Sequence, residues 1–167
     1  MVTNTDYFYK DYHMISEELA EVIKVAKEAG AAIMSIYDRV EVQNDLEMQS
    51  KEDHSPLTEA DLAAHHCIVD GLKNIDPETP IISEESTLPT YQERSEWKRY
   101  WLVDPLDGTK EFINGNGEFT VNIALIRNQI PILGVIYCPT SKDLYFSLED
   151  FGAFKVKIKN EINDFDL

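Results

Sequence analysis

The sequence predicts an α+β fold in which two N-terminal helices pack on one face of a largely antiparallel β-sheet. Two observations carry this prediction. Apolar residues recur at helical spacing in the first half of the chain, and from Phe119 onward short β-rich runs alternate with turns. At 167 residues the chain has room for one domain with a substantial core, but not for two independent ones.

The two helices are predicted from their apolar periodicity and their end signals. The first spans Ile15–Tyr37, where apolar residues return every three or four positions. The polar stretch Gln43–Ser55 is typical of a loop. A capping box formed by Thr58 and Asp61 predicts the start of the second helix, and Asp76-Pro77 predicts its end, because the residue before proline avoids helical backbone.

Six short strands are predicted after the helices. The first two end next to an acidic residue, and the other four form a meander joined by turns. A meander of this kind is antiparallel sheet. The residues after it, 159–167, have little apolar pattern and are expected to be a loose tail. The predicted strands are Pro80–Ser83, Arg99–Val103, Phe119–Ile126, Ile130–Tyr137, Leu144–Ser147 and Ala153–Ile158.

The charge of the chain limits its partners. There are 15 Lys and Arg against 31 Asp and Glu, which gives a formal net charge of −16. Such a charge repels nucleic acid polymers, so these are excluded as partners. A small phosphate ester can still bind, because bound divalent cations would invert the local field. The two cysteines lack CxxC spacing, so neither a disulfide framework nor a zinc site is indicated.

The location of the protein is predicted from what the sequence lacks. The N-terminal residues have no apolar segment of the kind found in signal peptides, and no apolar run approaches the roughly 18 residues of a membrane span. We therefore expect a cytoplasmic protein without a transmembrane segment. Peripheral attachment to the cytoplasmic face of a membrane stays open.

The densest candidate for chemistry is the segment Asp-Pro-Leu-Asp-Gly-Thr that starts at Asp104. Proline restricts the residue before it to extended backbone, and Gly108 permits a tight turn, so Asp104 and Asp107 can point at one place. The carbonyl of Leu106 then supplies a third oxygen between two acids. Hard cations such as Mg²⁺ prefer oxygen ligands of this kind.

An isolated string of this type is more often a structural turn, so its assignment depends on two further acidic elements. Glu84-Glu85 follows a predicted strand, and Ser55–Asp61 opens a predicted helix. The three elements together resemble the inositol monophosphatase superfamily in motif, order and spacing. The motifs are Ser55-Pro56-Leu57-Thr58-Glu59-Ala60-Asp61, Ser83-Glu84-Glu85-Ser86 and Trp101-Leu102-Val103-Asp104-Pro105-Leu106-Asp107-Gly108-Thr109.

The later segments are more similar to the 3′(2′),5′-bisphosphate nucleotidases of this family than to its inositol phosphatases. These segments are Lys110–Ile113, Gly117–Ile126 and Pro131–Tyr137. The resemblance runs from about Ile15 to Phe154. It implies the front half of an inositol monophosphatase-like α-β-α-β sandwich, in which residues 1–158 are the N-terminal metal-binding domain.

The resemblance also implies a metal site and its chemistry. Glu84, Asp104 and Asp107 are implied to bind Mg²⁺ through their carboxylates, and Leu106 through its carbonyl oxygen. Two such ions polarise a phosphoryl group and lower the pKa of a water molecule. Asp61 and Thr109, assisted by Glu84, are implied to activate and orient that water. The residues implied to lie against the substrate are Glu84, Leu106, Asp107, Gly108 and Thr109.

The implied reaction converts adenosine 3′,5′-bisphosphate, or its sulfated precursor, to an AMP-type product and phosphate. Hydrolysis of an inositol or sugar phosphate is an alternative that the same metal site would serve. A different class of function is a non-catalytic fragment that binds metal or a partner domain, or an acidic interaction module whose Asp104 turn is structural.

The chain departs from the family at its C-terminal end. Family members continue into a second domain that carries a Trp-Asp-x-Ala signature, and neither Trp97 nor Trp101 is followed by Asp. We therefore expect the C-terminal domain to be absent from this chain, and the chain to bind Mg²⁺ weakly and turn over poorly alone. Surfaces left exposed are expected to form a homo-oligomer or to pair with a separate C-terminal half.

Overall fold

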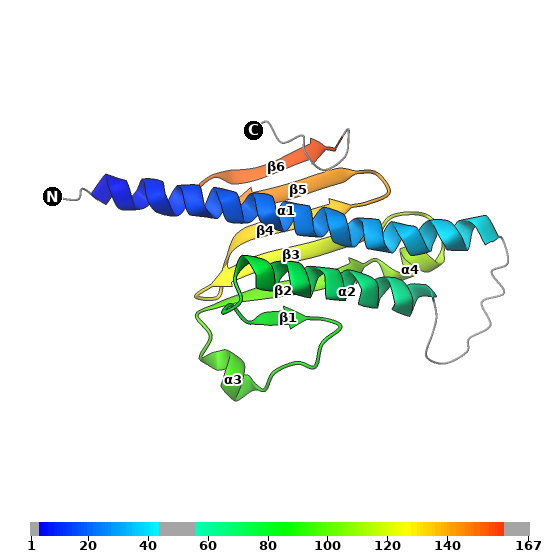
Figure 1. The fold of residues 1–167 in the computed structure, drawn as a ribbon, viewed down its shortest axis with the longest axis horizontal. Helices are drawn as coiled ribbons and strands as arrows, with labels where there is room; N and C mark the ends of the chain where they lie inside the picture. The colour runs from blue at the N-terminus through cyan, green and yellow to red at the C-terminus, as the bar shows by residue number, and fades with distance from the viewer. Residues whose placement is uncertain (1–3, 44–55, 159–167) are drawn as a thin grey trace.

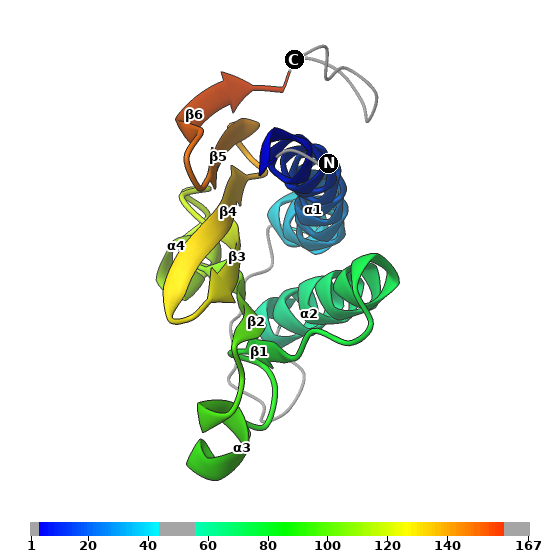
Figure 2. The ribbon, with the colours of Figure 1, turned by 90° about the vertical axis from the view of Figure 1, so that its left-hand side faces the viewer.

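The computed structural model describes residues 4–43 and 56–158, with side chains described in 17–39 and 59–158. Helix α1 (Asn4–Gln43) and helix α2 (Pro56–Ile75) lie on the same side of a six-stranded sheet (Figures 1 and 2). In the described part of the chain, no long helix covers the other face of the sheet. The predicted α+β architecture, with two helices packed on a largely antiparallel sheet, is confirmed.

The sheet has the strand order β1-β2-β3-β4-β5-β6, so neighbours in sequence are neighbours in space. β1 runs parallel to β2, and every other adjacent pair is antiparallel. A parallel pair places the C-terminal ends of its strands at the same edge. The strands are β1 Ile81–Ser83, β2 Arg99–Asp107, β3 Thr120–Arg127, β4 Ile130–Cys138, β5 Asp143–Leu148 and β6 Gly152–Lys157.

The hydrophobic core lies between the two long helices and the sheet. Along β2 and β3 the side chains alternate, and those facing the helices, such as Trp101 and Leu125, are fully buried. The helices approach each other closely at Gly71, where a Cβ atom would lie 2.5 Å from Cγ2 of Val25. This packing fixes α2 over β1 and β2, which carry the candidate site.

Several predicted boundaries are corrected by the structure. α1 is longer than predicted, because its helix also includes residues before Ile15 and after Tyr37. α2 starts at Pro56, so Thr58 lies inside the helix and the predicted capping box does not mark its start. Proline is well suited to a first helical position because its φ is already helical and its missing N–H is not needed there. β2 continues beyond Val103 to Asp107.

Two short helices complete the fold. α3 (Tyr91–Ser95) was not predicted, although its capping box is legible in the sequence: the Thr90 side chain accepts from the Glu93 amide, and the Glu93 side chain accepts from the Thr90 amide. α4 (Thr109–Ile113) follows β2 directly. Within the described residues, no helix combines the length and hydrophobicity that crossing a membrane requires.

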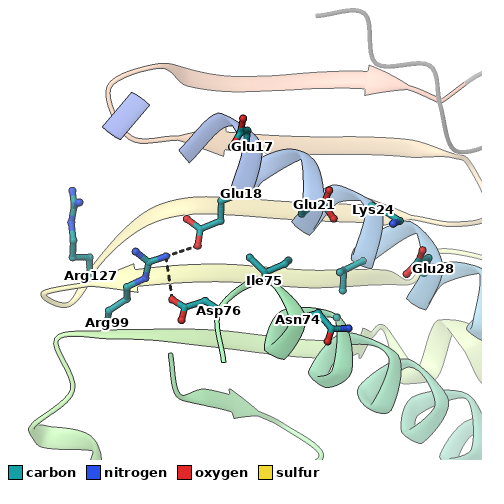
Figure 3. Close-up of a pocket in the computed structure, with 12 residues that line it drawn as sticks. Glu17, Glu18, Glu21, Lys24, Glu28, Asn74, Ile75, Asp76, Arg99 and Arg127 are labelled. Atoms are coloured by element: carbon teal, nitrogen blue, oxygen red, sulfur yellow. Dashed lines mark hydrogen bonds and ion pairs between the residues drawn. The ribbon is translucent and has the colours of Figure 1, made fainter. Parts of the chain in front are cut away.

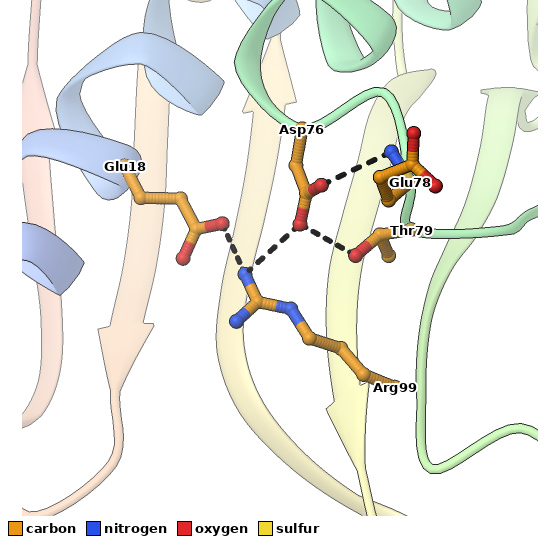
Figure 4. A network of polar contacts seen from close by, with 5 residues as sticks. All are labelled: Glu18, Asp76, Glu78, Thr79 and Arg99. Atoms are coloured by element: carbon orange, nitrogen blue, oxygen red, sulfur yellow. Dashed lines mark hydrogen bonds and ion pairs between the residues drawn. The ribbon is translucent and has the colours of Figure 1, made fainter.

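An ion-pair network joins the two helices to the sheet at the end far from the C-terminal ends of β1 and β2. Arg99, the first residue of β2, pairs with Glu18 of α1 and lies 3.8 Å from Asp76 at the end of α2 (Figure 4). Asp76 also accepts a hydrogen bond from the Thr79 hydroxyl at 2.6 Å, which lowers the pKa of its carboxyl. Arg99 therefore has a packing role.

Candidate metal and phosphate site

Parallel pairing of β1 and β2 brings two of the predicted metal ligands side by side. Ser83 pairs with Val103, so Glu84, which follows β1, and Asp104 of β2 lie at the same edge of the sheet. The amide nitrogen of Glu84 lies 3.2 Å from the Val103 carbonyl oxygen and donates a hydrogen bond to it. The register of one strand pair therefore sets the distance between these acids.

The turn after β1 is closed by two serines. Ser86 donates its hydroxyl to the Ser83 carbonyl at 2.9 Å, and the Ser86 amide donates to the same oxygen at 3.1 Å. Glu84 and Glu85 lie at the tip of this turn and are exposed. The turn therefore presents two carboxylates to solvent from a fixed backbone.

A β-bulge arranges the acids at the end of β2. Asp104 pairs with Asn122 and Asp107 with Thr120, so β2 has one more residue than β3 between these two pairs. The Leu106 amide donates to the Asp104 carboxylate, and the Leu106 side chain is buried. The amide group of Asn122 donates to Asp107 at 3.1 Å. The predicted turn is therefore a bulged strand end.

Asp61 comes to this cluster from the N-terminal part of α2. Burial, the nearby charge of Glu85 and a hydrogen bond shared with the Glu85 side chain raise the pKa of Asp61 to about 7. Asp104 and Glu84 add to the repulsion. Of the two neighbouring glutamates, Glu85 is thus the closer partner of Asp61.

Asp104 is affected in the same way. Burial comes first, and repulsion by Glu84 and Asp107 adds to it, so the pKa of Asp104 rises to about 6. Like charges crowded together disfavour ionisation, and a divalent cation among them would relieve the repulsion. The donor set consists of carboxylate and carbonyl oxygens, which is the chemistry that Mg²⁺ prefers. The residues present therefore fit a hard cation.

The acids are nevertheless arranged in pairs. Among the described side chains, in 17–39 and 59–158, no three or more of His, Cys, Asp or Glu form a group that could hold a metal ion. Asp61 shares a hydrogen bond with Glu85, Asp104 with Glu84, and Asp107 is held by Asn122.

Gly108 and Thr109 form the passage from β2 into α4. Gly108 has φ 99°, a conformation that side chains rarely adopt, and a Cβ there would lie 2.9 Å from the Glu118 carbonyl oxygen. The Gly108 carbonyl accepts from the Phe112 amide at 2.9 Å, and Thr109 is exposed at the first position of α4. Thr109 thus lies at the same end of the sheet as the acids.

Two of the hollows beside the sheet bear on the location of the site, and one of these two touches these acids. The larger, of about 820 Å³, lies between α1 and α2 near Arg99 and is lined by ion-paired side chains such as Glu18 and Asp76 (Figure 3). The other, of about 740 Å³, lies on the open sheet face and is lined by Glu84 and Asp104 among apolar side chains. We assign the chemistry to the second location, because the perturbed acids lie there.

Sequence reasoning missed two polar residues at the site, His65 and Asn122. His65 of α2 lies with its Nδ1 2.8 Å from the hydroxyl of Ser83, and burial lowers the pKa of its ring. Asn122 holds Asp107 from the neighbouring strand. The signal for His65 was its position four residues after Asp61, on the same helix face. No sequence signal revealed Asn122, because its role depends on the register of β2 and β3.

The fold is an α+β domain with acidic strand ends at one edge of its sheet, and the chain belongs to the inositol monophosphatase family. The profile of the Inositol monophosphatase family matches residues 15–163. Within the family the chain is similar to the 3′(2′),5′-bisphosphate nucleotidase CysQ of Salmonella typhimurium, with 51% identity over 131 residues. CysQ of Escherichia coli K12 is 52% identical over the same length.

Solved structures agree with this assignment. CysQ from Bacteroides thetaiotaomicron, a bacterial member of the inositol monophosphatase family, superimposes with a TM-score of 0.76 at 43% identity, covering 90% of this chain and 53% of that one. The extragenic suppressor protein SuhB from Bartonella henselae has a TM-score of 0.64 at 28% identity, covering 81% and 49%. The match with the Salmonella protein covers 78% of this chain and 52% of that protein. The chain thus spans about half the length of these relatives.

Proposed function

We propose that this chain carries the metal-binding part of a Mg²⁺-dependent phosphomonoesterase with 3′(2′),5′-bisphosphate nucleotidase activity. The observation that supports it most is the meeting of three acidic elements, from α2, β1 and β2, at one edge of the sheet. The names of the relatives that are 51% and 52% identical supply the substrate class. In this proposal residues 1–158 form the metal-binding domain.

In the proposed site, Glu84, Asp104 and Asp107 hold Mg²⁺ with their carboxylates, and Leu106 contributes its carbonyl oxygen. The bound ions supply Lewis-acid polarisation of the phosphoryl group and a lowered pKa for the attacking water. Asp61 accepts the proton of that water, a role for which a pKa of about 7 is well matched near neutral pH.

Thr109 orients the water through its hydroxyl, and Glu84 assists Asp61. The phosphate lies against the backbone N–H groups of Gly108 and Thr109, at the passage from β2 into α4. Because Gly108 is packed against the Glu118 carbonyl, the turn is held in place before any ligand binds. The partner in this proposal is a small phosphate ester, adenosine 3′,5′-bisphosphate, and the location is cytoplasmic.

The test is inorganic phosphate release from adenosine 3′,5′-bisphosphate in the presence of Mg²⁺. Asp107→Asn is expected to abolish release, and Asp150→Asn, an exposed residue in the turn between β5 and β6, is the matched control. Inositol monophosphate and a sugar phosphate, assayed in parallel, separate the nucleotidase from the alternative substrates. Release that survives Asp107→Asn would contradict the assignment of this residue.

We propose, as a second candidate function, that the open sheet face pairs with another polypeptide, either a second copy or a separate C-terminal half. Three large apolar side chains of the sheet favour this: Leu102 of β2, Ile136 of β4 and Tyr145 of β5 are 46%, 45% and 39% exposed. Ile136 pairs directly with Tyr145 across β4 and β5. Exposed apolar patches of this kind mark interaction surfaces.

This second function is tested by sedimentation velocity of the chain alone and with the C-terminal half of a relative added in trans. Ile136→Glu is expected to weaken association, whereas Ile130→Glu, exposed at the β3–β4 turn, serves as the control. If the chain sediments as a monomer both alone and with the C-terminal half added, the proposed pairing is contradicted. If phosphate release appears only in the mixture, the first proposal holds for the assembled protein.

A further inference from the structure

We propose that His65 is a positioning residue that sets the affinity of the Glu84 site for divalent metal, acting through the hydrogen bond between its ring and Ser83. The inference rests on the proposed metal-binding function. It starts from one contact: Nδ1 of His65 lies 2.8 Å from Oγ of Ser83. Ser83 precedes Glu84 and is only 3% exposed.

α2 carries His65 and Asp61 on the same face. The two residues are four positions apart, so their side chains lie one turn above the other. Asp61 contacts Glu85, and His65 contacts Ser83, so both reach the turn that follows β1. A single helix face thus provides the proposed catalytic base, Asp61, and a support for Ser83, the residue beside a metal ligand.

The hydrogen bond to the Ser83 hydroxyl helps to fix the position of Glu84, because hydrogen bonds hold the backbone of the turn between them. The Ser83 carbonyl accepts from both the hydroxyl and the amide of Ser86, and the Glu84 amide is bonded to Val103 of β2. The backbone around Glu84 is thus tied to β2 on one side and, through Ser83 and His65, to α2 on the other. Outer groups that hold a metal ligand in this way change metal affinity by about 10–100-fold when removed.

His66 offers the matched comparison. It is the next residue on α2, is exposed, and its ring centroid lies 5.5 Å from that of His65. Adjacent residues on a helix point in different directions, and His66 lies away from the turn after β1. A substitution there changes the same residue type on the same helix without touching the Ser83 contact.

The experiment is a titration of the folded chain with Mn²⁺, in which free Mn²⁺ is followed by electron paramagnetic resonance and Mg²⁺ is added as competitor. We expect His65→Leu to weaken Mn²⁺ binding about 10-fold, and His66→Leu to leave it within about twofold. His65→Asn is expected to restore most of the affinity, because its amide group can occupy the place of Nδ1 and bond Ser83.

A double-mutant cycle identifies the hydrogen bond as the cause. Ser83→Ala is expected to weaken Mn²⁺ binding as His65→Leu does, and the double variant to be no weaker than either single one. Thermal unfolding of each variant, recorded without metal, separates stability from affinity. A lower Tm for His65→Leu with unchanged Mn²⁺ affinity would make His65 merely structural and overturn the inference.

The same titration separates this inference from the proposed function. If the unsubstituted chain binds no Mn²⁺, the metal-binding function is overturned, and the inference with it. If the unsubstituted chain binds Mn²⁺, Asp107→Asn abolishes binding and His65→Leu does not change it, the function stands and only the inference is lost.

Discussion

The amide of Glu84 donates a hydrogen bond to the carbonyl oxygen of Val103, with 3.2 Å between nitrogen and oxygen. This bond extends the parallel pairing of β1 and β2 by one residue, to the point where both strands deliver an acid. The geometry of the site is therefore set by backbone pairing, and the acids are held together although they repel each other. The cost of that repulsion gives the first prediction.

Without metal, the folded chain is expected to lose stability as the pH rises through about 7, because the raised pKa of Asp61 opposes its ionisation. This pKa lies above the unfolded value of 3.8, so protonation of Asp61 favours the folded state. The stability that it contributes is fully present below about pH 4 and is lost as the pH rises through about 7. Asp61→Asn should thus be more stable than the natural chain at pH 8, by roughly 1–2 kcal/mol after solvent screening.

Urea unfolding at pH 4.5 and pH 8, without metal, measures this difference. Asp70→Asn, an exposed aspartate on the same helix, is the control and is expected to change stability equally little at both pH values. If Asp61→Asn and the natural chain had the same stability at pH 8, the acid cluster would not be strained in the way described. The variant should at the same time lose activity, which would make Asp61 an acid retained for function at a cost in stability.

The ion-pair network around Arg99 predicts that the stability of the fold depends strongly on this one arginine. Arg99→Met would leave Glu18, whose side chain is 13% exposed, without the arginine that offsets the burial of its carboxylate. We expect a loss of about 1–3 kcal/mol in the free energy of unfolding, the usual cost of an unpaired buried polar group. Urea denaturation at neutral pH measures it.

The control for this prediction is a solvent-exposed ion pair. Arg39 lies 2.8 Å from Glu59, and the two side chains are 50% and 55% exposed, so Arg39→Met is expected to cost no more than about 0.5 kcal/mol. Equal losses for the two substitutions would show that burial of Glu18 contributes nothing to the effect.

The Gly108 turn predicts a position that tolerates no side chain. Gly108 has φ 99°, and an added Cβ would lie 2.9 Å from the Glu118 carbonyl oxygen, so Gly108→Ala is expected to cost about 1–3 kcal/mol. Gly115 also has positive φ, 68°, but its nearest neighbour for a Cβ is 4.0 Å away. Gly115→Ala should therefore be clearly milder. Thermal unfolding measures both variants. Gly108→Ala combines backbone strain with a close contact, whereas Gly115→Ala has backbone strain alone.

Much of the fold could be predicted from the sequence, because its signals are local. Apolar periodicity located both long helices, and alternation with turns located the four meander strands. The start of α2 was misplaced because Thr58 and Asp61 imitate a capping box while Pro56 opens the helix. The bulge between Asp104 and Asp107 was not predicted, since it depends on pairing with β3.

Residue types in the sequence indicated which acids lie together at the sheet edge, but not which of them are partners. The sequence indicated the acids that gather at the ends of β1 and β2, but the pairing of Asp61 with Glu85 depends on how α2 lies over the sheet. The contact of His65 with Ser83 has the same origin, because it joins residues 18 positions apart in sequence. Contacts that depend on packing of one element on another leave only weak signals in a single sequence.

The close approach of the two long helices gives the last prediction. A Cβ on Gly71 would lie 2.5 Å from Cγ2 and 3.0 Å from Cγ1 of Val25, which is itself only 5% exposed. Alanine would add about 1 kcal/mol of helix propensity, but forcing the helices apart is expected to cost about 1–3 kcal/mol, so Gly71→Ala should be net destabilising.

The matched variant for this position removes the obstruction. Val25→Ala alone leaves a small cavity between the helices and is expected to destabilise, whereas the double variant Val25→Ala, Gly71→Ala fills that space with the new methyl group. Urea unfolding of the three variants gives the coupling energy, which we expect to be favourable by about 1 kcal/mol or more. Because α2 carries Asp61 and His65, the restored helix spacing should also restore Mn²⁺ affinity lost in Gly71→Ala. Additive losses in the double variant would show instead that the helices do not meet at these two residues.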